Sequence, residues 1–288
     1  MNNIRDLSLS IVIPTLGGNC LEKTLNYINK STIKPNEILL CIPKEFNNKV
    51  THLQKDNVYI IETEFKGQVS QRALGFKLAK SEFVMQLDDD ILVDENCFIN
   101  LINDIKENSY SSCGPSYYDL HSHEYKSFIL DSNFLSNNKL FSLINFNSFI
   151  IKEGCISKSG LNFGLKENTF LKNVEWLPGG CILHRKKNLI LSNYYKFNGK
   201  AYLEDVFHSK ILKNNGIDLL RSNNAIVYMD KNTKTTFLNL LIEFPIVLMI
   251  RIKFCRLYSY SLIRMFISII FLYLDLFINY LKKKHFEY

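Results

Sequence analysis

Residues 81–94 read SEFVMQLDDDILVD, and this stretch decides how the rest of the chain is interpreted. Phe83 to Leu87 is short, apolar and free of Gly and Pro, which is typical of a buried strand. Three aspartates follow directly at 88–90, and because Asp is a poor strand former we expect the strand to end there. Three adjacent carboxylates repel one another unless a cation lies among them. Oxygen ligands of this kind suit Mg2+ or Mn2+.

The aspartate run alone leaves two interpretations open. It is either an acidic turn in water or a site where a divalent ion is held. An ion bound by only one or two carboxylates fills its remaining positions with water and substrate phosphates. The second interpretation therefore predicts that a diphosphate binds at Asp88, Asp89 and Asp90.

The segments before the aspartates alternate between strand and helix patterns. Apolar, β-branched runs predict strands, and apolar residues at helical spacing predict helices. Ligands of open α/β sheets bind at the carboxyl ends of strands, where Pro14, Thr15 and the aspartates are expected. We expect an alternating α/β domain with a parallel sheet, formed by strands 8–14, 36–42, 57–61 and 83–87 and helices 20–30 and 68–80.

The second half of this domain is less regular. We expect a helix over 94–107, strands over 181–184 and 218–229 and a helix over 201–212, whereas 108–169 shows weak periodicity and predicts mixed strands and loops. His121 and His123 lie in that stretch and are expected at the surface, because no third metal ligand accompanies them.

Two short motifs in this half carry candidate chemistry. Residues 176–180 read WLPGG, and the glycine pair lets the backbone approach a ligand or simply forms a tight turn. Glu204 and Asp205 fall in the first turn of the last expected helix, where the helix dipole favours carboxylates. Ordinary helix starts carry acids for the same reason.

Cysteine usage and the N-terminus bear on the compartment. The seven cysteines are dispersed, with no CxxC pair, which points to reduced thiols in a cytosolic setting. The first residues, MNNIRD, contain no apolar stretch of a cleaved signal peptide. We therefore expect a cytoplasmic protein.

The C-terminal tail differs from the rest of the chain. Residues 231–288 hold nine Lys and Arg but three acidic residues, and so carry six of the seven net positive charges. No charge-free run reaches the roughly 18 residues of a spanning helix. Basic residues among long apolar runs favour an anionic membrane surface over nucleic acid.

The last segment of the tail has a helical pattern. Arg264, Ser268, Asp275 and Asn279 fall on one narrow stripe, the remaining positions are apolar, and 282–284 are lysines. This pattern predicts a helix lying in the membrane interface. Packing on the catalytic domain or on a second subunit is the alternative.

The order of these motifs resembles the inverting glycosyltransferases of family 2, which have the GT-A fold, a Rossmann-like nucleotide-diphospho-sugar transferase fold. The resemblance covers about residues 8–230. It is carried by SIVIPT at 10–15, GQVSQRALGFKLA at 67–79, LDDD at 87–90, WLPGG at 176–180 and LED at 203–205. It implies a GT-A domain over 1–235, and the tail over 236–288 is then a helical, membrane-associated appendage.

The resemblance also implies roles for particular residues. Pro14 and Thr15 would flank the nucleoside, and Arg72 would lie near the nucleotide or its diphosphate. Asp88 and Asp89 would approach the ribose and the ion, and Asp90, with Asp88, would ligate Mg2+ or Mn2+. Trp176, Gly179 and Gly180 would line the acceptor side. Asp205, accompanied by Glu204, would be the catalytic base.

The chain departs from the family pattern in three places. LCIPKE at 40–45 stands where the family usually has an acidic run that contacts the nucleobase of the donor. Asp230 stands where a His is usual. No QxxRW motif follows Glu204 and Asp205. The last absence predicts one sugar transferred per encounter.

We therefore expect an inverting glycosyltransferase at the cytoplasmic face of the membrane. It would move a sugar from a nucleotide diphosphate sugar to a hydroxyl of a lipid-linked glycan in surface polysaccharide synthesis. The alternatives are a nucleotidyltransferase on a similar scaffold and a non-catalytic protein that binds sugar nucleotides or acts as a membrane scaffold.

Overall fold

The computed structural model describes residues 7–64, 66–167, 172–195, 200–230 and 237–286. The chain divides into two compact units. Unit 1 comprises residues 1–125 and 169–230, and unit 2 comprises 126–168 and 231–288. The domain boundary expected at 235/236 lies outside the described residues. Segment 126–168, which the sequence analysis assigned to the first domain, belongs to unit 2 together with the tail.

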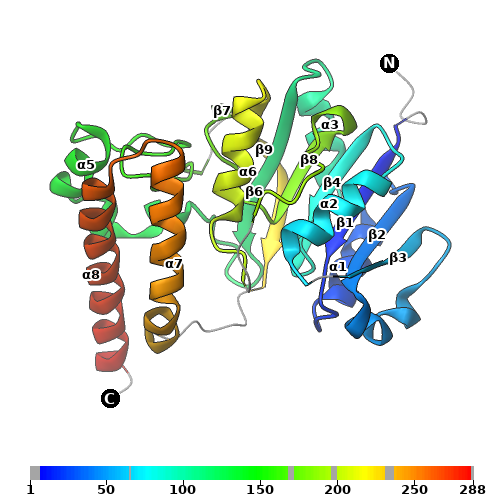
Figure 1. Cartoon of the computed structure of the whole chain (residues 1–288), viewed down its shortest axis with the longest axis horizontal. Coiled ribbons are helices and arrows are strands. Elements are labelled where there is room, and N and C mark those ends of the chain that lie inside the picture. The colour runs from blue at the N-terminus through cyan, green and yellow to red at the C-terminus, as the bar shows by residue number, and fades with distance from the viewer. Residues whose placement is uncertain (1–6, 65, 168–171, 196–199, 231–236, 287–288) are drawn as a thin grey trace. The chain divides into compact units, whose positions relative to one another are not determined.

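Unit 1 is built on a nine-stranded sheet in the order β3-β2-β1-β4-β8-β6-β9-β5, with β7 also pairing with β9 (Figure 1). Strands β1 to β4 are parallel to one another. The strands are β1 Leu9–Pro14, β2 Glu37–Pro43, β3 Val58–Thr63, β4 Phe83–Leu87, β5 Ile91–Val93, β6 Ser111–Asp119, β7 Lys172–Val174, β8 Cys181–Arg185 and β9 Asp218–Met229.

Helices cover both faces of this sheet, because successive strand residues point to opposite faces. Val12 and Val84 pack on α2 (Gln68–Leu78) around Phe76. Their neighbours Ile11 and Met85 pack in the large core that α1 (Leu21–Lys30) and α3 (Cys97–Ile105) share. The fourth helix of the unit, α6 (Glu204–Asn214), lies beside β9.

The first half of the sheet confirms the expected alternation, and the second half corrects the expectation of a wholly parallel sheet. β8 pairs antiparallel with both β4 and β6, and β9 pairs parallel with β6 but antiparallel with β5. A strand, β5, follows the aspartates directly, so the next helix begins at Cys97 rather than at Asp94. Ile91 and Val93 of β5 are buried in the core. Their burial explains why the chain forms a further strand after the aspartates, which pairs with β9.

Unit 2 consists of helices and irregular segments. Its helices are α4 (Asn133–Ser136), α5 (Lys139–Phe146), α7 (Phe237–Leu257) and α8 (Leu262–Phe286). One apolar cluster joins Phe141 and Phe163 to Phe271 of α8, and a second joins Cys255 of α7 to Met265 of α8. Both pieces of the chain are therefore needed to form this unit.

Helix α8 is placed differently from the expected interfacial helix. Ser268 and Asp275 of the polar stripe are buried, and Ser268 accepts a hydrogen bond from Asn145 at 3.1 Å. Arg264 donates to the carbonyl of Ile144 at 2.7 Å. Arg264 and Ser268 therefore contact segment 126–168, Asp275 is buried, and Asn279 is exposed.

Helix α8 also meets a length criterion that charge-free runs alone do not reveal. Leu262–Leu281 is 20 residues long with a mean hydropathy of 1.9. Within the described part of the chain it is the one helix long and apolar enough to cross a membrane. Length and composition are the whole basis of this observation, which agrees with the expected apolar appendage.

Candidate active site

A cleft of about 340 Å3 lies at the carboxyl ends of β1 and β4. It is where the sheet geometry places a ligand of an open α/β fold. The described residues that line it are Pro14, Thr15, Leu16, Gly18, Lys66, Gly67, Gln68, Gln71, Asp88, Asp89, Asp90, Lys200 and Ala201. The ends of two strands that the sequence analysis singled out therefore meet in one cavity.

Thr15 and Asp89 connect the two strand ends directly. The Thr15 hydroxyl donates to the Asp89 carboxylate and accepts from the backbone N–H of Gly17 at 3.0 Å. Gln71 of α2 donates to the carbonyls of Thr15 and Cys41 at 2.8 and 2.6 Å. These bonds fix the floor of the cleft where a nucleoside was expected.

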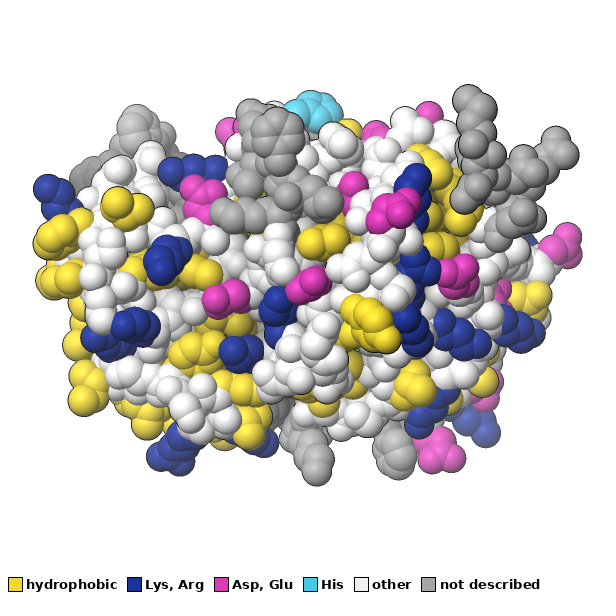
Figure 2. All heavy atoms as spheres, turned by 90° about the horizontal axis from the view of Figure 1, so that it is seen from above, with side chains coloured by type: hydrophobic (Ala, Val, Ile, Leu, Met, Phe, Trp, Pro, Cys, Tyr) yellow, Lys and Arg dark blue, Asp and Glu magenta, His cyan; other side chains and the backbone are white. Residues whose placement is uncertain are grey.

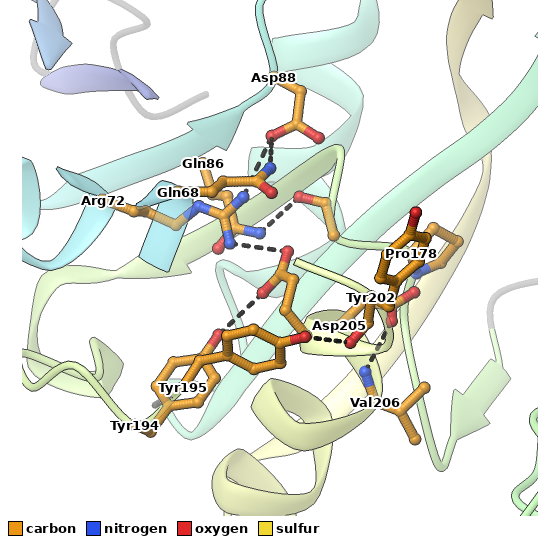
Figure 3. A network of polar contacts seen from close by, with 12 residues as sticks. Gln68, Arg72, Gln86, Asp88, Pro178, Tyr194, Tyr195, Tyr202, Asp205 and Val206 are labelled. Atoms are coloured by element: carbon orange, nitrogen blue, oxygen red, sulfur yellow. Dashed lines mark hydrogen bonds and ion pairs between the residues drawn. The ribbon is translucent and has the colours of Figure 1, made fainter. Parts of the chain in front are cut away.

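Arg72 lies buried behind the cleft, in contact with the cleft residue Asp88. Its side chain is 2% exposed, and its two amino groups donate to Asp88 at 3.1 Å and to Glu204 at 2.9 Å (Figure 3). Burial alone would lower the pKa of Arg72, but Glu204 and Asp88 outweigh it and keep the guanidinium charged. Arg72 therefore bridges two carboxylates from distant parts of unit 1 and does not line the cleft.

Tyr194 completes this bridge from below. Its hydroxyl donates to the second oxygen of Glu204 at 2.9 Å, and its ring stacks on His208 of α6. Burial and, to a smaller extent, the charge of Arg72 together lower the pKa of His208 to about 3, so the imidazole is neutral. Each carboxylate oxygen of Glu204 thus accepts a hydrogen bond from a buried side chain.

The three aspartates carry the electrostatics expected of a cation site. The pKa of Asp88 is raised to about 7: burial is the main cause, Arg72 opposes it, and Glu204 and Asp90 reinforce it. Burial also raises the pKa values of Asp89 and Asp90. Acidic groups crowded in this way are stabilised by a positive charge.

The residues fit a hard divalent ion held with the help of a substrate. No group of three or more His, Cys, Asp or Glu among the described residues could hold a metal on its own. Asp90 is exposed at the cleft and forms no ion pair with another described residue. The Asp88 side chain is 25% exposed. Asp90 and Asp88 would supply carboxylate oxygens, and a diphosphate and water would supply the remaining ligands.

Asp205 lies next to the loop that was expected on the acceptor side. One of its oxygens accepts from the N–H of Val206 at 2.9 Å, at the start of α6. A Cβ built on Gly179 would lie 3.2 Å from the Asp205 Cβ and 2.4 Å from a Glu204 oxygen, so the loop packs on both acids. Asp205 is not among the described residues that line the cleft, but Glu204 ties its helix to Asp88 through Arg72.

The same loop is fixed to strand β4. Gln86 donates to the carbonyl of Gly179, and Gly180 accepts from the N–H of Asp88 at 2.8 Å. Trp176 is 3% exposed, so its ring lies in the core. The acceptor-side role expected for Gly179 and Gly180 stays a prediction.

Two further candidates lie away from the cleft. Asp230 pairs with Lys23 at 2.9 Å and with His121 at 3.2 Å, in a surface cluster. His121 is 64% exposed, as expected for a surface residue. Neither residue lines the cleft.

Sequence reasoning missed several residues that form the site. Lys66, Gln68 and Lys200 line the cleft, and Tyr194 supports Glu204. Lys66 and Gln68 flank Gly67, the first residue of the motif at 67–79. Their position beside this motif is a signal from which they could have been predicted. No pattern in the sequence marks Tyr194 or Lys200.

Comparison with known proteins gives an independent view. The sequence model described as Glycosyl transferase family 2 matches residues 10–160, which is more than half of the chain. No curated protein sequence matches.

Solved structures provide two further comparisons. The structure of GalNAc-T7 with UDP, GalNAc and Mn2+ has 17% sequence identity and a TM-score of 0.57 over 79% of this chain and 44% of that one. Residues 1–349 of S. aureus TarS give 14% identity and a TM-score of 0.47 over 78% of this chain and 60% of that one. The chain thus spans less than two thirds of either, and the likeness to GalNAc-T7 shows the fold alone.

The family match covers β1 to β6 and includes Thr15, Arg72 and all three aspartates. The fold agrees with the GT-A architecture that the sequence predicted. The chain therefore belongs to glycosyl transferase family 2.

Proposed function

We propose that the protein transfers one sugar from a nucleotide diphosphate sugar to an acceptor hydroxyl with inversion at the anomeric carbon. One observation carries the proposal. The aspartates that line the cleft are joined through Arg72 to Glu204, the residue before Asp205. Residues expected on the donor side and on the acceptor side thus meet in one fixed framework.

The donor is proposed to lie in the cleft with its nucleoside near Pro14 and Thr15. Its diphosphate would face Asp88 and Asp90 and the cleft lysines Lys66 and Lys200. A divalent ion, Mg2+ or Mn2+, would neutralise charge on the leaving diphosphate when bound there. UDP and Mn2+ in GalNAc-T7, a protein of the same fold, support this assignment.

Asp205 is proposed as the general base. Its position in the first turn of α6 favours the ionised carboxylate, because the helix dipole stabilises negative charge there. It would accept the proton of the acceptor hydroxyl as that oxygen bonds to the anomeric carbon and the bond to the diphosphate breaks. A single displacement of this kind inverts the configuration and needs no covalent nucleophile.

The acceptor is proposed to be a lipid-linked glycan in surface polysaccharide synthesis, at the cytoplasmic face of the membrane. The support is the tail, which carries six of the seven net positive charges, and the apolar length of α8. A protein held at an anionic membrane surface would meet such an acceptor without releasing it into water.

The test uses the full chain with Mn2+ and a panel of UDP-, GDP- and dTDP-sugars. We expect one donor to bind and to be consumed, and Asp205→Asn to lower its turnover by about 10²- to 10⁴-fold while its dissociation constant stays within about twofold. Asp218→Asn, which changes an exposed carboxylate at the start of β9, is the matched control.

Three outcomes would count against parts of the proposal. Unchanged turnover in Asp205→Asn would refute the base. Tight donor binding without turnover in the unmodified protein would favour the non-catalytic alternative. Release of a sugar 1-phosphate instead of a nucleoside diphosphate would favour a nucleotidyltransferase.

A further inference from the structure

Unit 2 exposes an unusual share of the apolar side chains. Among the described residues 23 large hydrophobic side chains are exposed, and 18 of them belong to unit 2, which contains about a third of the chain. Thirteen of these lie on α7 and α8. The left side of Figure 2, which unit 2 forms, shows apolar side chains at the surface with basic side chains among them. Apolar patches of this extent mark an interaction surface.

Helix α8 turns its apolar side outward. Ile263, Ile270 and Leu274 are 74%, 58% and 46% exposed and lie on one helical face. Ser268 and Asp275, on the opposite side, are buried. This is the reverse of an amphipathic helix on a water-soluble core.

Unit 2 contains a buried cluster of four polar side chains that hydrogen-bond to one another. Asn145 donates to Ser268 at 3.1 Å and accepts from Ser157 at 2.8 Å and from Ser159 at 2.5 Å. All four residues are at most 3% exposed. A surface that is apolar around a satisfied polar cluster suits a hydrocarbon environment, where an unpaired polar group is costly.

The outward face of α7 indicates which apolar environment fits. Ile242, Ile246 and Met249 lie on one face and are 67%, 46% and 53% exposed. On the same face the exposed residues Lys253 and Arg256 follow toward the end of the helix. An apolar face that ends in basic residues matches a bilayer with anionic headgroups, whereas a face that pairs with a second copy has no need of that charge.

We propose that unit 2 inserts the outward apolar faces of α7 and α8 into the hydrocarbon of a phospholipid bilayer, with Lys253 and Arg256 at the headgroups. An interfacial helix held by charge would keep its polar stripe in water, but here Ser268 and Asp275 of the stripe are buried. Attachment therefore depends on apolar insertion more than on charge. The inference rests on the proposed function for the acceptor that the membrane would supply, but its test involves no sugar transfer.

The test is flotation of the full chain with phosphatidylcholine vesicles, with and without phosphatidylglycerol, in low salt and in about 1 M NaCl. At that salt concentration the Debye length is about 3 Å, so purely electrostatic attachment is lost. We expect the wild-type protein to float with both vesicles at both salt concentrations. The double variant Ile242→Asp/Ile270→Asp should partition onto vesicles at least about tenfold less, because Asp is strongly disfavoured in hydrocarbon.

Tyr59→Asp is the matched control, since Tyr59 is 43% exposed on the edge strand β3 of unit 1. It should float like the wild-type protein. Circular dichroism and thermal unfolding of each variant check that the fold is retained, and the salt resistance of the wild-type protein needs no variant.

Three results would overturn the inference. The first is release of the wild-type protein by high salt. The second is wild-type flotation of the folded double variant. The third is a lipid-free dimer, measured by light scattering, that binds no vesicles and dissociates in the double variant, because a second copy would then cover these faces. Failure of the separate transfer assay would refute the proposed function and leave the flotation result unaffected.

Discussion

Arg72 donates to Glu204 at 2.9 Å across 132 residues of sequence. The contact joins the first half of α2 to the first residue of α6, and neither side chain is more than 6% exposed. Because the same guanidinium also holds Asp88, a change in any of the three side chains is expected to affect the other two.

Arg72→Met should destabilise unit 1 severely. Two carboxylates would lose their shared buried cation, and breaking a buried ion pair by removing one partner costs about 3–5 kcal/mol. Urea denaturation measures the loss. Lys213→Met, which breaks the more exposed pair with Asp218, should cost about 0–1 kcal/mol. If both substitutions lowered the free energy of unfolding equally, the buried bridge of Arg72 would contribute no more to stability than the exposed ion pair.

Tyr194→Phe should lower turnover more than donor affinity. The change removes the hydroxyl that donates to Glu204 and leaves a buried carboxylate oxygen without that partner, at a cost of about 1–3 kcal/mol. Glu204 starts the helix that presents Asp205, so kcat should fall while the donor dissociation constant stays nearly constant. Tyr59→Phe, at an exposed position, is the control. A change in donor affinity alone would contradict this role.

Stability should depend on pH through Asp88. Its pKa is about 7 in the folded protein and 3.8 as the ordinary value, so the folded state holds a proton that the unfolded state has lost between these limits. The contribution is therefore present below about pH 4 and is lost as the pH rises through 7. Burial is the main cause of the raised pKa, and among the charged groups Arg72 lowers it while Glu204 and Asp90 raise it.

The measurement compares the wild-type protein with Asp88→Asn at about pH 5 and about pH 8. The stability of the variant relative to wild type should increase between the two values, because only the wild-type protein loses the Asp88 contribution. Mn2+ should raise the melting temperature of the wild-type protein more at the higher pH, since a carboxylate ligand must be ionised. A pH-independent difference would mean that Asp88 is ionised throughout.

Gly179→Ala should reduce activity with little loss of structure. The new Cβ would lie 2.4 Å from a Glu204 oxygen and displace the start of α6, and a displacement of about 1 Å can cost 10²-fold in rate. Gly75→Ala makes a similar clash, 2.4 Å from the Val12 Cγ1, but in the core between α2 and β1. That variant should lose about 1–3 kcal/mol of stability instead. Turnover assays and urea denaturation of both variants separate the two effects.

The first half of unit 1 could be predicted because its signals are local. The apolar runs at β1 and β4 are short and end in Pro14 and in the aspartates, so the position of the cleft followed from strand ends alone. The strand β5 was missed because three residues, Ile91–Val93, carry no readable period of their own.

The bridge and the direction of α8 depend on contacts between distant segments. Arg72 looks the same in sequence whether it meets a phosphate or Glu204, and only the fold brings Glu204 to it. The stripe of Arg264, Ser268 and Asp275 was recognised, but periodicity does not say which side of a helix faces protein. Asn145, from a segment with weak periodicity, determines that.

The chain enters unit 2 twice, at 126–168 and again after 230. During synthesis the first of these pieces leaves the ribosome about a hundred residues ahead of Phe271 and Leu272, the α8 residues that pack against its Phe141 cluster. Until α8 is synthesised, the apolar residues of this segment lack the partners that bury them, and exposed apolar surface of this kind is prone to aggregate. A gene shortened after codon 230 would leave segment 126–168 without its partners from α8. We expect such a product in inclusion bodies, even though every strand of the sheet is encoded.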